Sequence, residues 1–147
     1  GAIWLHEHGP KGGDEINRLK AGANFGWPKT THGIDYDDTI ISNLKTAPGV
    51  EPSTVIWVPS IAPSGMAFYS GDLFPAWKGN LFIGGHGSLD LVRLVIDGEK
   101  VVGEERLLKD LQPKPERIRD VRQGPDGAIY MVTDSATGRL IKLVPRK

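Results

Sequence analysis

Short runs of apolar and β-branched residues, separated by turn signals, dominate the second half of the chain. Four of these runs predict strands, at 66–69, 80–83, 91–96 and 104–108. Glycine-rich breaks such as Ser70-Gly71-Asp72 and Asp97-Gly98 separate them. The pattern therefore predicts an antiparallel meander of four strands.

The same succession of elements recurs toward the C-terminus. The runs LVRLVI at 91–96 and LIKLVP at 140–145 begin 49 residues apart, and NLFI and AIYM lie 48 apart. A period near 50 residues with about four strands per unit is typical of β-propeller blades. The last repeat has only three predicted strands, so its sheet lacks an outer partner.

The first 50 residues differ in composition and pattern from the rest of the chain. One strand, at 2–8, is followed by a long segment rich in Gly, Asp and Asn, which we predict to be a loop. A helix over 14–21 is an alternative, but Gly22 would end it quickly. A loop of this length inside a compact domain is usually functional.

Length and composition narrow the function class. The chain has 147 residues, 18 basic and 18 acidic side chains and no cysteine. This length suggests about one domain. The balanced charge gives no excess of basic residues to bind nucleic acid or anionic lipid. Without cysteine the chain has no thiol nucleophile and no disulfide. No apolar run approaches the roughly 20 residues of a membrane span. Because the chain opens on GAIWLHEH without an initiator Met, we expect a segment of a longer protein.

Two features near the N-terminus are candidates for metal binding. His6 and His8 would project from one face of a strand, although no third zinc ligand follows at a recognisable spacing. Gly9-Pro10 can present bare main-chain carbonyl oxygens to a hard cation. It is equally a plain turn at the end of a strand, and both interpretations remain open.

Carboxylates gather in the same region. Asp14 and Glu15, and then Asp35, Asp37 and Asp38, offer oxygen ligands that suit Ca²⁺. The spacing is not that of an EF-hand, so a solvated acidic loop is the alternative.

A pair of arginines suggests anion binding. In an extended run, Arg117 and Arg119 project on one side while Ile118 points into the sheet. Two guanidinium groups on one face suit a ligand that carries carboxylates. Alternatively, the two arginines pair with Glu116 and Asp120 on a solvated edge.

Long motifs in consistent order carry a resemblance that covers nearly the whole chain. They are EHGPKGGDEINRLKAGANFGWP, GIDYDD, WVPSIAPSGMAFYSGDLFPAWKGNLFIGG and RIRDVRQGPDGAIYMVTDSATG. They resemble the C-terminal part of the soluble PQQ-dependent aldose sugar dehydrogenases, the glucose/sorbosone dehydrogenase family. The resemblance implies an all-β fold, a partial six-bladed β-propeller of about two to three blades of four-stranded antiparallel sheets.

The resemblance also implies an organisation within a single propeller domain. Residues 1–53 would be a strand plus a calcium and cofactor loop, and 54–111 one complete blade. Residues 112–147 would be a final three-stranded blade. The expected partners are an aldose sugar and either the remaining half of the propeller or a second copy of the chain.

The implied cofactors are pyrroloquinoline quinone (PQQ) and Ca²⁺. By resemblance, the carbonyls of Gly9 and Pro10 hold the Ca²⁺ that also binds the quinone, Tyr36 touches the cofactor, and Arg117 and Arg119 face its carboxylates.

Two further sets of residues follow from the resemblance. Glu15 and the main-chain oxygen of Phe25 would form a second calcium site. Gly85, His86 and Gly87 would lie against the cofactor. Many relatives carry Lys where this chain has Gly87, so one contact to the quinone is missing or is supplied by His86.

The activity implied is oxidation of the C1 hydroxyl of an aldose to the lactone, in a protein exported to the periplasm or secreted. In the family the general-base histidine lies in the first half of the propeller, and no histidine here matches its motif. We therefore identify no catalytic residue in this chain and expect it to be inactive alone. The alternative is a non-catalytic calcium-binding propeller module that binds a protein or a glycan.

Overall fold

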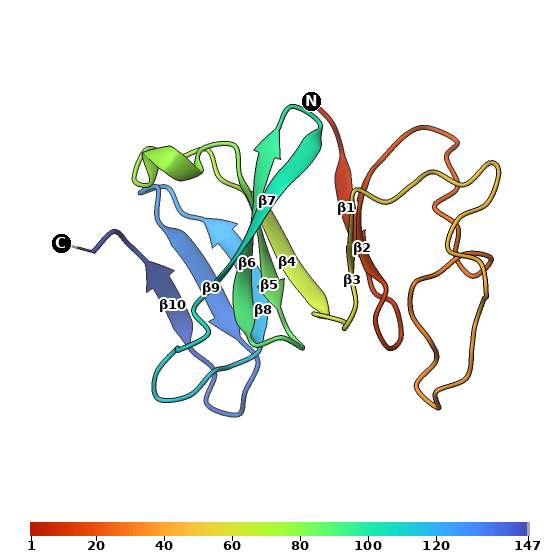
Figure 1. Cartoon of the computed structure of the whole chain (residues 1–147). Coiled ribbons are helices and arrows are strands. Elements are labelled where there is room, and N and C mark those ends of the chain that lie inside the picture. Colours follow the sequence, from red (N-terminus) through yellow and green to blue (C-terminus); the bar gives the residue numbers. More distant parts are fainter. Residues whose placement is uncertain (147) are drawn as a thin grey trace. The chain divides into compact units, whose positions relative to one another are not determined.

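The computed structural model describes residues 1–146 and consists of β-strands and loops. The chain divides into two compact units, Gly1–Ala62 (unit 1) and the part from Pro63 onward (unit 2). Within the described residues there is no α-helix, only a single short 3₁₀ turn, η1 (Pro75–Trp77). The labels of Figure 1 are used throughout.

Unit 1 contains a three-stranded antiparallel sheet in the order β1-β2-β3. Its strands are β1 (Trp4–Glu7), β2 (Asp14–Arg18) and β3 (Val55–Trp57). The central residue of β2, Ile16, is fully buried and lies opposite His6 on one side and Val55 on the other. Long loops fill the stretch between β2 and β3 (Figure 1).

The strand β2 corrects the sequence analysis, which predicted loop or a short helix there. Asp14, Glu15 and Asn17 are all buried, so the strand reads as polar although it lies in the middle of a sheet. Only Ile16 carries the usual apolar signal. Hydrogen bonds to these polar side chains take the place of apolar packing, and a hydrophobic pattern cannot reveal them.

Unit 2 contains the predicted meander as a four-stranded antiparallel sheet in the order β4-β5-β6-β7. Its strands are β4 (Pro63–Phe68), β5 (Leu81–Gly85), β6 (Asp90–Asp97) and β7 (Lys100–Leu107). β7 starts earlier than predicted because Lys100 already pairs with Asp97 across a tight turn. Gly98 makes that turn possible, since its φ of 60° is unfavourable for other residues.

The second sheet of unit 2 has the three strands that the sequence predicted. They are β8 (Ile118–Gln123), β9 (Ile129–Thr133) and β10 (Leu140–Leu143), in the order β10-β9-β8. In the described part of the chain, β10 has a strand partner on only one side. Such an edge leaves main-chain groups available to another strand.

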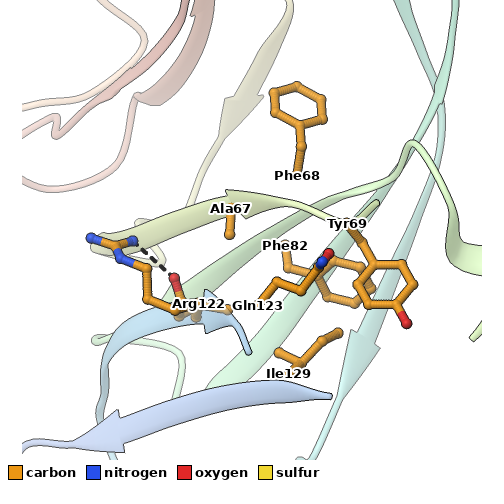
Figure 2. Close-up of a pocket in the computed structure, with 8 residues that line it drawn as sticks. Ala67, Phe68, Tyr69, Phe82, Arg122, Gln123 and Ile129 are labelled. Atoms are coloured by element: carbon orange, nitrogen blue, oxygen red, sulfur yellow. Dashed lines mark hydrogen bonds between the residues drawn. The ribbon is translucent and has the colours of Figure 1, made fainter. Parts of the chain in front are cut away.

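The core of unit 2 lies where these two sheets pack together. Tyr69, Phe82 and Ile129 meet there, and Figure 2 shows their side chains around one apolar hollow. The rings of Tyr69 and Phe82 are 6.2 Å apart, edge to face. Burying each such side chain contributes about 1.5–3 kcal/mol, so this packing holds the two sheets together.

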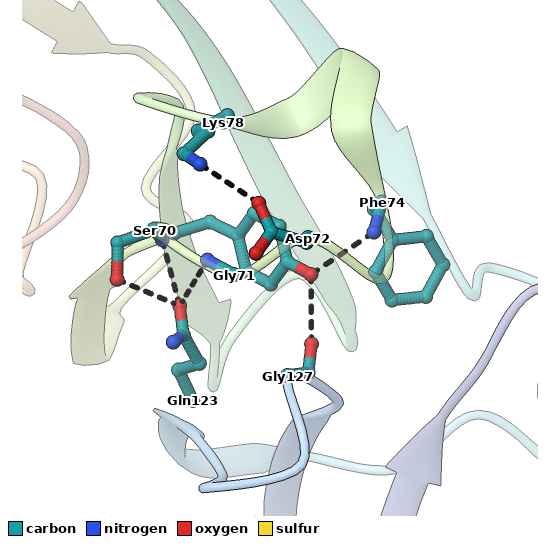
Figure 3. A network of polar contacts seen from close by, with 8 residues as sticks. Ser70, Gly71, Asp72, Phe74, Lys78, Gln123 and Gly127 are labelled. Atoms are coloured by element: carbon teal, nitrogen blue, oxygen red, sulfur yellow. Dashed lines mark hydrogen bonds and ion pairs between the residues drawn. The ribbon is translucent and has the colours of Figure 1, made fainter.

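Polar contacts close one end of that core. The Tyr69 hydroxyl donates to the carbonyl of Gly127 at 2.7 Å and accepts the amide of Phe74 at 3.0 Å. Gln123 accepts amide hydrogens from Ser70 and Gly71 beside it (Figure 3). The β8–β9 turn is thereby tied to the segment after β4.

Candidate functional site

The Gly9-Pro10 loop of unit 1 is held by a buried carboxylate. Asp14 Oδ1 accepts the Gly9 amide at 2.9 Å. Its other oxygen accepts the Ser60 hydroxyl and the amides of Ile61 and Ala62, at 2.6, 2.7 and 2.9 Å. Asp14 is fully buried, so the loop that carries the candidate calcium carbonyls is anchored by charge-assisted hydrogen bonds.

The same loop is closely packed against a second segment. A Cβ added at Gly9 or at Gly33 would come within 1.9 or 2.0 Å of the Gly12 carbonyl oxygen. The amide of Lys11 donates to the carbonyl of Ile34 at 3.1 Å. Unit 1 therefore brings the segment that carries the exposed Tyr36 beside Gly9-Pro10.

The acidic residues of this region do not form a shared cluster. Both oxygens of Asp14 are used by the chain, as described above. Asp35 accepts the amide of Tyr36, Asp37 accepts the amide and hydroxyl of Thr39, and Asp38 pairs with Lys11. Asp35 and Asp37 thus stabilise local turns, whereas Asp14 and Asp38 tie distant segments of unit 1 together.

Glu15 has a different environment. It lies opposite Glu7 in the β1–β2 ladder, and the Asn17 carboxamide donates to both carboxylates, at 3.1 and 2.6 Å. Burial, with the charge of Glu15 adding to it, raises the pKa of Glu7. The buried Asn17 Oδ1 has no hydrogen-bond partner. Two carboxylates and an unsatisfied carboxamide oxygen are the donor set of a hard cation.

Unit 1 also brings Glu15 and Phe25 together. Both line a cavity of about 110 Å³, along with Thr30, His32 and Lys45. A water molecule needs only about 10–15 Å³ of such volume, so there is room for a cation with part of its hydration shell.

In unit 2 the arginine pair lies at the start of β8, where a register shift between Ile118 and Asp120 interrupts the regular strand alternation. Ile118 is 1% exposed, whereas Arg117 and Arg119 are exposed. The solvated-edge alternative does not match the structure, because Glu116 pairs with Arg139 and Asp120 with Arg122. Within the described residues, no ion pair joins Arg117 or Arg119 to a carboxylate.

The end of β5 lies beside these arginines. Ser64 Oγ bridges the carbonyls of Gly84 and Ile118, at 2.9 and 2.6 Å, and so ties β5 to β8. Gly85 ends β5, and His86 and Gly87 follow in the turn. Within unit 2, the predicted site residues at the end of β5 therefore lie near those at the start of β8.

Asp134 is a member of this group that the sequence analysis did not identify. His86 Nε2 lies 2.7 Å from Asp134 Oδ2. That hydrogen bond, with the charges of His86, Arg117 and Arg119 adding to it, holds the pKa of Asp134 below its usual value. The only available signal was its position directly after β9, one residue past the end of the strand.

The described residues contain no group of three or more His, Cys, Asp or Glu side chains placed to hold a metal. The stacked rings of His6 and His8 are 6.4 Å apart, on one face as predicted. That absence concerns clusters of side chains, and a site made of main-chain carbonyl oxygens and one carboxylate is not such a cluster. No helix among these residues is long and apolar enough to cross a membrane.

The chain is similar in sequence and in structure to known sugar dehydrogenases. Aldose sugar dehydrogenase YliI of Escherichia coli (strain K12) is 46% identical over 147 residues, which are 99% of this chain and 39% of that protein. A crystal structure of glucose dehydrogenase matches with a TM-score of 0.93 and 49% identity, over 99% of this chain and 42% of the other. The chain thus spans well under half of these relatives.

A more distant structure shares the fold. The PQQ-bound aldose sugar dehydrogenase of Streptomyces coelicolor matches with a TM-score of 0.68 and 21% identity, over 97% of this chain and 40% of the other. These similarities and the blade-sized antiparallel sheets confirm the predicted fold class, all-β and part of a propeller. The model of the glucose/sorbosone dehydrogenase family matches residues 1–142, and the chain belongs to that family.

Proposed function

We propose that this chain is the cofactor-binding C-terminal part of a PQQ- and calcium-dependent dehydrogenase that oxidises the C1 hydroxyl of aldose sugars to the lactone. One observation supports this more than any other. Arg117 and Arg119 are exposed before and after buried Ile118, and neither forms an ion pair within the described chain, although both lower the pKa of Asp134 through their charge. An anionic ligand with several carboxylates would fit them.

The residues present fit both implied groups. Cations at Arg117 and Arg119 suit the carboxylates of PQQ, and the exposed Gly87 has no side chain that would obstruct a flat ring. In unit 1, the closely packed Gly9-Pro10 loop offers main-chain oxygens for a first Ca²⁺.

A second Ca²⁺ would be held by Glu15 and the main-chain oxygen of Phe25. The unsatisfied Asn17 Oδ1 and the repulsion between Glu7 and Glu15 support a cation there. A divalent ion would relieve the repulsion between the two carboxylates.

The chemistry supplied on binding would be hydride acceptance by the quinone and polarisation of its carbonyl by Ca²⁺. The residues of this chain would bind and orient. Arg117 and Arg119 would fix the carboxylates, Tyr36 would contact the ring, and Asp14 would hold the Gly9 amide and so keep the loop in place. No residue here is assigned as the general base.

Because the chain spans 39% of its curated relative, the whole activity would require the remaining part of the propeller. The free edge of β10 is one place where that part, or a second copy, would pair. We place the protein in the periplasm or outside the cell by analogy with the family.

Titration with PQQ in the presence of Ca²⁺, followed by the change in quinone absorbance, tests the proposal. We expect saturable binding that weakens about tenfold or more in Arg117→Gln and Arg119→Gln, since each loses a charge-assisted contact. Arg122→Gln is the matched control, because Arg122 pairs with Asp120 on the same strand.

A dye-reduction assay with glucose completes the test. The chain alone should bind PQQ without turning over sugar, and the full-length protein should do both. Binding of Ca²⁺ without any binding of PQQ would reject the proposal in favour of a calcium-binding module for a protein or a glycan.

A further inference from the structure

The carboxylate of Glu116 lies buried directly before Arg117, and the proposed function leaves it unused. Glu116 is 7% exposed, whereas Arg117, the next residue, is exposed. Ile118, which follows, is again buried. Arg117 is therefore held between two neighbours with buried side chains, and whatever fixes Glu116 also limits where the main chain of Arg117 can lie.

Two side chains from the end of β9 and the start of β10 bind the Glu116 carboxylate. Arg139 Nε donates to Glu116 Oε2 at 3.1 Å. A hydrogen bond from the Thr133 hydroxyl, with the contact and the charge of Arg139 adding to it, outweighs burial and holds the pKa of Glu116 below its usual value. Glu116 is therefore ionised at neutral pH and forms a buried ion pair with Arg139.

Arg139 is itself fixed by its neighbours. Its Nη1 donates to the Gln112 carbonyl at 2.6 Å, and its amide donates to Thr133 Oγ1 at 2.9 Å. The Thr133 amide in turn donates to the Arg139 carbonyl at 3.0 Å. The guanidinium thus joins the loop before β8 to the β9–β10 turn, and Glu116 lies at this junction.

Arg117 depends on such contacts because it lies outside the regular ladder of β8. The strand begins at Ile118, and its register with β9 shifts between Ile118 and Asp120. The Arg117 carbonyl accepts the Asp134 amide at 2.8 Å, which ties its main chain to the residue after β9. The anchored Glu116 is a second tie on the N-terminal side, so the peptide that carries the Arg117 side chain is held from both directions.

Stability alone is a weak reason for a buried ion pair. Removing a carboxylate and a guanidinium from water costs about as much free energy as their attraction returns. The pair does fix direction, because the planar guanidinium donates along set lines and the ionised carboxylate strengthens each hydrogen bond. A role in positioning the adjacent residue therefore fits the Glu116–Arg139 pair better than a role in stability.

We propose that Glu116 and Arg139 are positioning residues that hold Arg117 where it meets a carboxylate of the anionic ligand. This inference rests on the proposed function, because the ligand is the PQQ of that site. Neither residue is assigned a contact with the ligand, and both act through Arg117. A cation that is already held in place binds an anion more tightly, because less conformational freedom is lost on binding.

Isothermal titration of the chain with PQQ at saturating Ca²⁺ tests this with single and double variants. We expect Arg139→Ala and Glu116→Gln each to raise the Kd about fivefold, and no more than Arg117→Gln does. When either change is added to Arg117→Gln, the Kd should not rise further. A residue that acts through Arg117 has no effect once that guanidinium is absent, whereas independent effects multiply.

Control variants separate position from stability. Arg139→Lys keeps a cation beside Glu116 and should recover most of the lost affinity. Arg93→Ala breaks the Arg93–Glu105 pair in the other sheet of unit 2, so it should lower the stability to urea and leave the Kd for PQQ unchanged. Urea unfolding checks that each variant is folded before titration. If Arg139→Ala does not fold, the cycle of Glu116→Gln with Arg117→Gln decides, because glutamine keeps the shape of the side chain.

The outcomes distinguish this inference from the proposed function. Losses of affinity that multiply in the double variants, or an unchanged Kd in Glu116→Gln and Arg139→Ala, would overturn the positioning role and leave the proposed function standing. A loss of the same size in Arg93→Ala would also overturn it, since general destabilisation would then explain the effect. Failure of the unchanged chain to bind PQQ would reject both.

Discussion

Replacing Asp14 with asparagine tests whether one buried carboxylate organises the Gly9-Pro10 loop. Asp14 Oδ1 accepts one amide and Oδ2 accepts two amides and a hydroxyl. An asparagine keeps the shape but has a single oxygen. With that oxygen on the Oδ2 side, its NH₂ group faces the Gly9 amide, and two donors then meet without an acceptor.

The expected cost follows from these contacts. An unsatisfied buried amide costs about 1–3 kcal/mol, and three hydrogen bonds that lose a charged acceptor each weaken by roughly 0.5 kcal/mol. Asp14→Asn should therefore lower the free energy of unfolding by about 2.5–4.5 kcal/mol. Ser60→Ala removes one hydroxyl donor and leaves Asp14 charged, so its cost should be about 1 kcal/mol.

Urea unfolding followed by tryptophan fluorescence measures both variants, because buried Trp57 lies directly opposite Asp14 in the β2–β3 ladder. EDTA in the buffer removes any contribution of bound calcium. If Asp14→Asn stayed within 0.5 kcal/mol of the unchanged protein, or if Ser60→Ala cost as much, the anchoring role of Asp14 would be refuted.

Three further predictions concern unit 2. Tyr69→Phe should cost about 2 kcal/mol in urea unfolding, because the Phe74 amide and the Gly127 carbonyl lose their shared hydroxyl (Figure 3). Tyr130→Phe loses only an exposed hydrogen bond to Asp126 and should cost under about 0.5 kcal/mol. Gly84→Ala should cost about 2–3 kcal/mol, since its Cβ would come 2.4 Å from Ser64 Oγ and 2.8 Å from Ile118 Cγ2. The control Gly103→Ala meets nothing closer than 3.4 Å and should be nearly neutral. Equal stability of the two variants would contradict the crowding at Gly84. The Lys142 hydrogen bond, with those from Ala128 and Tyr130, lowers the pKa of Asp126 from 3.8 to about 2. The ionised Asp126 carboxylate therefore stabilises the fold above pH 3.8, and this stabilisation is lost as the pH falls toward 2. Asp126→Asn should flatten the fall in melting temperature over that pH range. An unchanged slope would count against the Asp126–Lys142 pair.

Local pattern was sufficient for most of unit 2. The strands there alternate or run apolar between glycine turns, and β4 to β10 formed close to the predicted ranges. The sequence also predicted that Ile118 lies in the core, and the structure has it buried between two exposed arginines. These features depend on side-chain periodicity, which any strand imposes on its own sequence.

Local pattern was insufficient where polar residues are buried. The sequence of β2 resembles a polar loop because Asp14 and the amide nitrogen of Asn17 form hydrogen bonds with groups elsewhere in the sheet and its loops. For the same reason the sequence left open whether Asp14 belonged to a calcium site or to a solvated acidic loop, whereas in the structure Asp14 anchors main-chain amides.

The sequence by itself determined the all-β class, the repeated meander, and the residue types available for binding an anion and a hard cation. Only the tertiary structure decided that His86 meets Asp134, and that Asp14 reaches Ser60, Ile61 and Ala62. The physical reason is distance along the chain. Periodicity reports on neighbours within one strand, whereas hydrogen bonds between residues some 50 positions apart exist only after the strands have paired and packed.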